Sequence, residues 1–411
     1  MAQNLLCGVK LLMLMRKIIL FFTLFVISYS ANAQLFKGNR FISTSLGVGS
    51  VVPTNDFLDG SNRIPAYKSL ALRFGYSSLA ATLDDYIWGQ PYMGVGFFAA
   101  DFRRKNDLGK PMSIYLFQGA RLHQFSDRFG LNYEWNLGCS FNWKPYDPIT
   151  NSDNVAIGST MNVHIAFNLY FKYALSNKLS ANLGVSATHF SNGSSLQPNA
   201  GINGVSMLLG LAYNLDRKRN TSRKYVGDDV FDYQKRFVSE YSVLITEKRV
   251  EVDTLGTRLS TSYPQQAFRV YGLNYLFFSK VSVRASWGFG IDATYDESAG
   301  ITALAQADPR TGKMVDRVVL GSIPERFSIG LSLVGETSMP YYSIFAQLGY
   351  DLLHAKVPDS RFYQILGVRI PFNDTFFMKF GIRATKFSAA QYLYFGLGLK
   401  TEKLRNRYKK Y

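Results

Sequence analysis

Long runs of alternating apolar and polar residues constrain the fold of this chain more than any other feature. From Met161 to Leu175 the odd positions carry large apolar or aromatic side chains, and the even positions carry mainly Asn, Ala, His, Lys and Tyr. The same alternation returns between Leu179 and Ser191 and between Asn203 and Leu215. Because successive side chains of a β-strand point to opposite faces, each run predicts a strand with one apolar face and one polar or small face.

Strand length and polar-face composition separate two all-β folds. The runs are longer than the ~5–6 residues of a common soluble strand and long enough for the ~9–11 residues of a tilted transmembrane strand. A secreted β-sandwich would carry Lys, Glu and Thr on its polar face, whereas these strands carry many Gly, Ser, Asn and Ala residues. The 26 Tyr and 32 Phe residues suit the aromatic girdles of a membrane barrel. We therefore predict an antiparallel transmembrane β-barrel of the outer membrane, with the sandwich as the alternative.

Sixteen strand candidates divide the chain into two halves. They predict a β-barrel unit over residues 34–215, a basic linker over 216–235, a second β-barrel-like half over 236–400 and a basic tail over 401–411. The halves are compatible with one barrel of up to sixteen strands or with two barrels of eight, since eight strands already close a filled barrel. The candidates lie near residues 41–52, 66–77, 91–103, 111–122, 130–145, 161–175, 179–191, 203–215, 236–250, 266–278, 281–295, 326–338, 341–354, 362–372, 375–386 and 390–400.

A short internal similarity links the two halves. The segment Gly184–Ser191 resembles Gly381–Ser388, which predicts a weak internal repeat. His189 of the first half aligns with Lys386 of the second half. The second half therefore lacks a histidine at this position, and we predict that this half of the chain has a structural role.

The N-terminus carries the features of a secretory signal peptide. Arg16 and Lys17 precede the apolar run Ile18–Ile27, and Ala31-Asn32-Ala33 supplies a small-residue cleavage site. The run is shorter than the ~20 residues of a membrane-spanning helix, which weighs against an N-terminal anchor. Residues 1–33 are therefore predicted to be removed on export. The formal charge of +17 favours polyanionic partners, and export favours phospholipid or lipopolysaccharide over nucleic acid.

A histidine and a serine stand on the apolar face of one predicted strand. His189 and Ser191 are two residues apart and share that face with Leu183 and Val185. Unpaired polar groups are costly in hydrocarbon, and an imidazole beside a hydroxyl is the general-base and nucleophile pair of acyl transfer. The alternative is an interfacial pair that bonds to water or lipid headgroups. In an exported barrel the seventh strand runs outward, so both residues face the outer leaflet, where lipopolysaccharide lies.

Five segments around this pair form a pattern: His189-Phe-Ser-Asn-Gly193, Pro198-Asn-Ala-Gly-Ile202, Trp143-Lys-Pro-Tyr-Asp-Pro148, Asn154-Val-Ala-Ile-Gly-Ser159 and Gly94-Val-Gly-Phe-Phe-Ala-Ala-Asp101. Together they resemble the outer-membrane lipid A deacylases, which are PagL-type acyloxyacyl hydrolases, and in particular the longer, two-part members of that family. The resemblance covers roughly residues 85–215. It implies a serine esterase on the outside of the barrel, with Ser191 as the nucleophile and His189 as the general base.

The resemblance also implies roles for the residues next to the pair. Asn192 and a backbone N–H of the Gly193 loop would form the oxyanion hole. At the position of the family's acidic third member this chain has Asn203. This is a departure, because an amide orients the imidazole without the charge of a carboxylate. The alternative acids are Asp147 and Asp153, which lie in the loop between the fifth and sixth predicted strands.

Two functions from different classes follow from this pattern. The first is an esterase that removes an ester-linked 3-hydroxyacyl chain from lipid A in the outer leaflet. The second is a non-catalytic barrel, either a porin or a lipid-binding scaffold. No metal-ligand spacing joins His123, His164 and His354, so neither a metal nor another cofactor is predicted. The sequence leaves the oligomeric state open.

Overall fold

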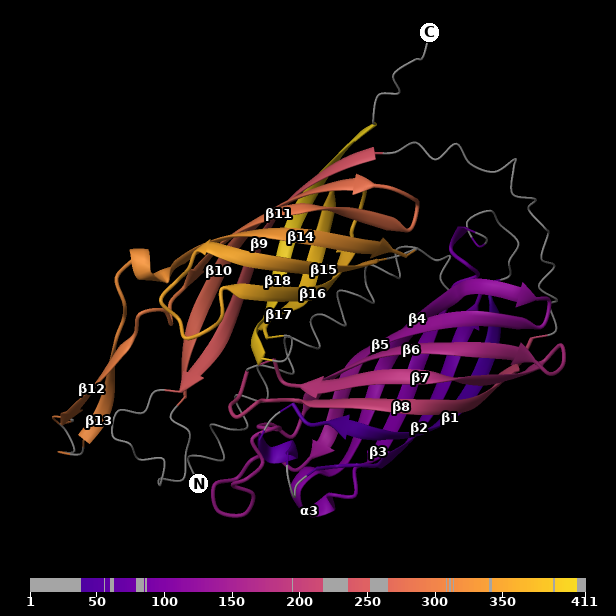
Figure 1. Cartoon of the computed structure of the whole chain (residues 1–411), viewed down its shortest axis with the longest axis horizontal. Coiled ribbons are helices and arrows are strands. Elements are labelled where there is room, and N and C mark those ends of the chain that lie inside the picture. The colour runs from indigo at the N-terminus through magenta and orange to yellow at the C-terminus, as the bar shows by residue number, and fades with distance from the viewer. Residues whose placement is uncertain are drawn as a thin grey trace, which may run out of the picture. The chain divides into compact units, whose positions relative to one another are not determined.

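The computed structural model is an all-β molecule with two closed eight-stranded antiparallel barrels (Figure 1). It describes residues 38–404 except for 55, 60–62, 79–84, 86, 194, 217–235, 252–264, 308, 310–311, 313, 340–341 and 387–388. The predicted fold class is confirmed, and the strands close as two barrels rather than one. The predicted signal peptide over residues 1–33 lies outside the described residues, as do most of the predicted linker and the end of the predicted tail. In the described part of the chain, no helix is long and apolar enough to cross a membrane.

The first barrel contains eight strands in sequence order. Each strand pairs with its neighbour in antiparallel register, and the first strand closes the barrel on the eighth. The closing register places Phe41 opposite Asn214 and Val52 opposite Asn203. The strands are β1 (Asn39–Val52), β2 (Tyr67–Ser77), β3 (Tyr92–Asp101), β4 (Gly109–Ser126), β5 (Phe129–Trp143), β6 (Asn162–Ala174), β7 (Leu179–Ser191) and β8 (Ile202–Asn214).

The alternation in the sequence separates the outside of this barrel from its lumen. On β7 the odd residues Leu183 and Val185 are 53% and 48% exposed, whereas the even residues Ser186 and Thr188 are buried. An outer wall of exposed aliphatic side chains is unfavourable in water and favourable in hydrocarbon. The outside of the barrel is therefore its lipid-facing side.

Side chains fill the middle of the lumen. The guanidinium of Arg73 lies 3.3 Å from the carboxylate of Glu134, and both side chains are almost fully buried. Arg73 also donates hydrogen bonds to Tyr115 and Ser45, and Asn168 donates one to Glu134. An interior of eight strands is just wide enough to be filled in this way. Pairing offsets part of the cost of burying the two charges, and removal of one partner would leave the other uncompensated.

Loops at one end of the first barrel pack into a cap with its own apolar core. Their described residues lie within 53–66, 102–108, 144–161 and 192–201, and they include the short helices η1 (Asp56–Leu58) and α3 (Lys105–Leu108). At the other end, short turns at 127–128 and 175–178 join β4 to β5 and β6 to β7. The buried core of the cap consists of Val51, Phe57, Leu58, Ile64, Tyr67, Ala100, Phe102, Leu108, Trp143, Ala156, Ile157, Phe190 and Ile202. A packed core of this kind holds the loops in fixed positions.

The second barrel also has eight strands, and its first strand pairs with its last. These are β9 (Arg236–Glu251), β10 (Gln265–Lys280), β11 (Ala285–Asp296), β14 (Phe327–Ser338), β15 (Ser343–Leu353), β16 (Phe362–Pro371), β17 (Phe376–Thr385) and β18 (Ala389–Leu404). All sixteen predicted strands correspond to barrel strands, although β18 extends into the predicted tail. β17 is the seventh strand of its barrel, so the similar segments that begin at Gly184 and Gly381 lie on equivalent strands.

A separate hairpin between β11 and β14 was not predicted. It consists of β12 (Thr302–Ala307) and β13 (Met314–Val319), which pair only with each other among the described strands, and the short helix η3 (Pro324–Arg326) follows it. Its first strand reads Thr-Ala-Leu-Ala-Gln-Ala, which is short and rich in alanine. Such a segment carries little of the alternation or the β-branched content that marks a strand.

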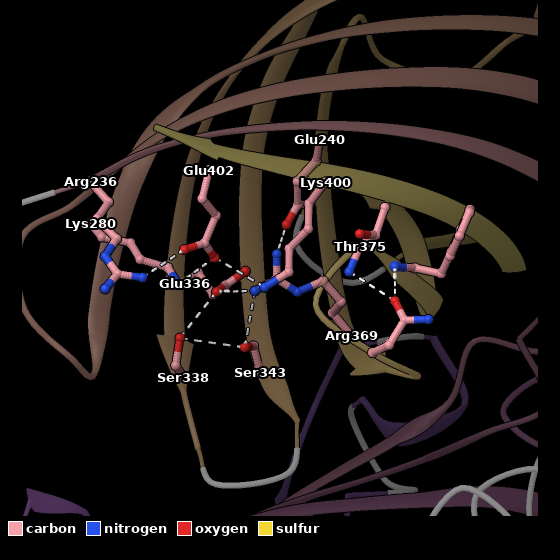
Figure 2. Close-up of polar contacts among 12 residues, drawn as sticks. Arg236, Glu240, Lys280, Glu336, Ser338, Ser343, Arg369, Thr375, Lys400 and Glu402 are labelled. Carbon is pink, nitrogen blue, oxygen red and sulfur yellow. Dashed lines mark hydrogen bonds and ion pairs between the residues drawn. The ribbon is translucent and has the colours of Figure 1, made fainter. Parts of the chain in front are cut away.

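Ion pairs connect the strands across the lumen of the second barrel (Figure 2). Arg369 bonds to Glu240 and lies 2.5 Å from Glu336, and all three side chains are buried. At the end where β9 begins and β18 ends, Glu402 pairs with Arg236, Lys280 and Lys400. Buried carboxylates require such partners, because an isolated charge is very costly away from water. Further pairs join Lys379 to Glu240, Arg383 to Asp351 and Lys248 to Asp296.

Candidate active site

Two neighbouring strands bring three polar side chains together on the lipid-facing side of the first barrel. His189 and Ser191 lie at the end of β7, and Asn203 lies at the start of β8, directly opposite His189 in the strand register. Ser191 Oγ lies 2.8 Å from His189 Nε2, and His189 Nδ1 lies 2.6 Å from Asn203 Oδ1. The three residues therefore form one continuous hydrogen-bonded row.

The partners of the imidazole define which ring nitrogen carries the proton. Asn203 Oδ1 is an acceptor, so His189 Nδ1 is the nitrogen that donates to it. This leaves the lone pair of Nε2 directed at Ser191 Oγ, where it accepts a hydrogen bond from the hydroxyl. Neutral histidine in this tautomer is the form that acts as a general base.

The amide of Asn203 has a second partner outside the strand pair. Its Nδ2 donates a hydrogen bond to Thr54 Oγ1 at 3.1 Å. Thr54 lies in the β1–β2 loop, two residues after β1 ends, and β1 pairs with β8. The hydrogen-bonded row therefore has a fourth member, which the sequence analysis did not identify.

A glycine packs against the imidazole. Gly201 has a φ of +76°, a left-handed conformation that favours glycine. A Cβ atom at this position would lie 3.1 Å from His189 Cε1. The Gly201 N–H donates to the carbonyl of Ala156, and the Ala200 N–H donates to that of Val155. These bonds connect the β7–β8 loop to the β5–β6 loop.

Asn192 is completely buried and holds the β7–β8 loop in place. Its backbone N–H donates to Asn199 Oδ1 at 2.9 Å, and its side-chain Nδ2 donates to the Leu196 carbonyl at 3.0 Å and to Ser159 Oγ at 3.4 Å. Gly193 follows with a φ of +60° and turns the chain out of the strand. In this structure the donors of Asn192 are therefore directed at atoms of the loops around it.

The two aspartates proposed as alternative acids have other partners. Asp147 Oδ1 accepts hydrogen bonds from the Thr150 N–H, the Ile149 N–H and the Thr150 hydroxyl, which hold the pKa of that carboxyl below its usual value. Asp153 accepts a hydrogen bond from the Ser152 hydroxyl. The structure brings neither carboxylate to the Nδ1 atom of His189, where the amide of Asn203 is bound.

The other histidine of this region lies on the lumen side. His164 is 1% exposed and stacks on Phe190 with ring centroids 4.8 Å apart. Phe190 lies between His189 and Ser191 in the sequence, so this aromatic contact supports the strand from inside the barrel. Across the described ranges of residues 38–404, no three His, Cys, Asp or Glu side chains form a group that could hold a metal ion.

Two family models match the chain. Residues 70–212 match the family described as lipid A 3-O-deacylase (PagL), and residues 243–403 match the family described as acyloxyacyl hydrolase, C-terminal domain. The chain belongs to the PagL-type lipid A deacylase family. The two-part organisation implied by the sequence resemblance is confirmed, and the family makes the protein an ester hydrolase of the outer membrane.

Solved structures of outer-membrane barrels show lower similarity. The outer membrane enzyme PagL is 19% identical, and the match covers 41% of this chain and 97% of that chain with a TM-score of 0.28. Neisserial surface protein A is 9% identical over 43% of this chain and 96% of that one, with a TM-score of 0.28. The alcaligin outer-membrane receptor FauA from Bordetella pertussis is 12% identical over 90% and 76%, with a TM-score of 0.25. These TM-scores lie below 0.5, whereas the two family models together match residues in both barrels. A comparison with curated proteins gives no match.

Proposed function

We propose that this protein removes an ester-linked 3-hydroxyacyl chain from lipid A in the outer leaflet, with Ser191 as the nucleophile. The observation that carries the proposal is the hydrogen-bonded row of Ser191, His189 and Asn203 on the outward face of β7 and β8, where Ser191 is 3% exposed. An aqueous substrate would be served better by a site in a lumen or a cleft. A site on the outer wall suits a substrate that arrives sideways through the membrane.

The reaction follows from the orientation of these groups. Ser191 Oγ attacks the ester carbonyl while His189 Nε2 takes the hydroxyl proton, and Asn203 Oδ1 accepts from the imidazolium at Nδ1. The C–O bond to the sugar then breaks, and Nε2 returns the proton to the leaving oxygen. Water attacks the acyl-enzyme in the same way, which releases the fatty acid and restores Ser191.

The neighbouring residues support the binding of the substrate. We assign the Gly193 N–H as the donor to the tetrahedral oxyanion, and Asn192 as the residue that shapes this part of the loop. The outward side chains of β8, including Met207 and Leu209 at 64% and 62% exposed, continue the apolar wall below the site and suit the acyl chains. Arg103 and Lys105 are exposed on the β3–β4 loop at the same end, where they suit anionic headgroups.

The proposal is tested on lipid A itself. The protein is expressed in an outer membrane of defined lipid A, and the lipid is analysed by mass spectrometry. We expect the mass to fall by one 3-hydroxyacyl chain, compared with cells that carry an empty vector. Labelling of the purified protein with a fluorophosphonate should place the adduct on Ser191. An unchanged lipid A spectrum with folded protein in the membrane would instead favour the non-catalytic scaffold.

A methyl group at Gly201 tests how closely the loop fits the imidazole. We expect Gly201→Ala to lower kcat about tenfold, because the strained backbone and the contact with His189 displace the ring. The measurement is steady-state deacylation of lipid A in detergent micelles. Gly335→Ala is the matched control, since a Cβ at Gly335 has no heavy atom within 4 Å. An unchanged rate for Gly201→Ala would show that the ring does not depend on this contact.

A further inference from the structure

Asn203, the third member of the hydrogen-bonded row, must be held in one orientation to serve as an acceptor. A carboxylate at this position would not need to be oriented. The two oxygens of a carboxylate are equivalent, so rotation of the group by 180° leaves an acceptor facing the imidazole. An amide has one acceptor and one donor end. If the amide of Asn203 rotated, its NH₂ group would face His189 Nδ1 and favour the tautomer that carries its proton on Nε2. In that tautomer Nε2 has no lone pair for the Ser191 proton.

Thr54 is placed to prevent this rotation. Its Oγ1 atom accepts a hydrogen bond from Asn203 Nδ2 at 3.1 Å, while Asn203 Oδ1 lies 2.6 Å from His189 Nδ1. A hydrogen bond donated at the nitrogen of an amide also polarises the group, and so strengthens the bond accepted by its oxygen. Thr54 therefore acts on the same atom that stabilises the imidazolium.

The loop that carries Thr54 is anchored although Thr54 itself is exposed. The Val51 N–H donates to the carbonyl of Ile64, which joins the two ends of the loop. Phe57 and Leu58 are 4% and 1% exposed in the apolar core of the cap. The described residues on both sides of Thr54 are thus anchored, Val51 at the end of β1 and Phe57 and Leu58 in the cap.

We propose that Thr54 is a positioning residue of the deacylase, which fixes the amide of Asn203 with its carbonyl toward His189. The inference rests on the proposed function and extends it. It explains how an amide serves at a position where the family's pattern has an acid. It also makes Thr54 and Asn203 a coupled pair, since the hydroxyl matters only while residue 203 has an amide to orient.

The test is a double-mutant cycle on the purified full-length protein, with lipid A in detergent micelles. We expect Thr54→Val to lower kcat about tenfold with little change in KM, because one hydrogen bond that orients the base is lost. Thr54→Ser keeps the hydroxyl and should recover most of the rate. In the Asn203→Asp background the loss caused by Thr54→Val should shrink to less than about threefold, since a carboxylate needs no orientation. Thr44→Val, a lipid-facing threonine on β1, is the matched control.

Each result separates the inference from the proposed function. Equal losses from Thr54→Val in both backgrounds would overturn the inference, because they would show a structural role that is independent of the amide. A wild-type rate for Thr54→Val would also overturn it, and the deacylase assignment would stand. A purified wild-type protein without deacylase activity would overturn the proposed function and the inference together.

Discussion

Replacing Ser191 by alanine is expected to lower the deacylation rate by at least ~10³-fold. The hydroxyl is the only atom of that side chain that could form the acyl-enzyme, and His189 Nε2 would then lie beside a methyl group. His189→Ala should cause a loss of similar size. The double variant should be little worse than either single one, because the two residues act as a unit. The rate is measured as fatty acid released from lipid A by the purified protein.

The control for this prediction lies on the same strand. Ser186 faces the lumen and bonds to Thr188 at 3.3 Å, so Ser186→Ala should keep the wild-type rate. Circular dichroism of each variant checks that the barrel has folded. Substantial activity in folded Ser191→Ala would contradict the assignment of the nucleophile.

Two substitutions of Asn203 are expected to change kcat in opposite directions. Asn203→Leu removes the acceptor at His189 Nδ1 and should lower kcat about 10²-fold, because both the tautomer and the orientation of the ring are lost. Asn203→Asp keeps the acceptor and adds a negative charge beside the imidazolium. A charge-assisted hydrogen bond is roughly twice as strong as a neutral one, so we expect kcat to rise about tenfold.

The same assay distinguishes Asn203 from the aspartates of the β5–β6 loop. Asp147→Asn keeps an acceptor for the turn at Thr150 and should change kcat by less than about twofold. A large loss from Asp147→Asn, together with a small effect of Asn203→Leu, would mean that an acid from the loop orients His189 in the membrane. Thermal unfolding of both variants shows whether a change in rate follows a change in stability.

Local patterns were sufficient to locate the barrel strands. Met161–Leu175 and Leu179–Ser191 alternate because one face meets lipid and the other a narrow lumen, and this two-sided environment is imposed on every barrel strand. The β12–β13 hairpin is a separate sheet, and the alanine-rich sequence of its first strand lacks the alternation of a barrel strand. The number of barrels depends on which edges meet, and no local pattern records that β1 pairs with β8.

Some contacts of the candidate site could likewise be predicted from local sequence, and others could not. The contact between His189 and Asn203 was predictable, since both lie on the outer face of consecutive strands that pair with each other. Thr54 is 149 residues away from Asn203 in the sequence. Its contact with the site arises from the closure of the barrel, which places the end of β1 beside the start of β8. The contact between Gly201 and the imidazole of His189 was not predictable either, because a glycine at the end of a loop carries no local signal of the side chain that it will contact.

The ion pairs inside the second barrel have a consequence for the permeability of the outer membrane. A hydrated ion that crossed this lumen would have to separate Arg369 from Glu240 and Glu336, where low polarity strengthens each attraction. These ion pairs therefore oppose the passage of ions through the second barrel, while the outside of that barrel adds lipid-facing surface. A cell that inserts many copies of the protein therefore adds lipid-facing surface to its outer membrane without adding conducting pores for solutes.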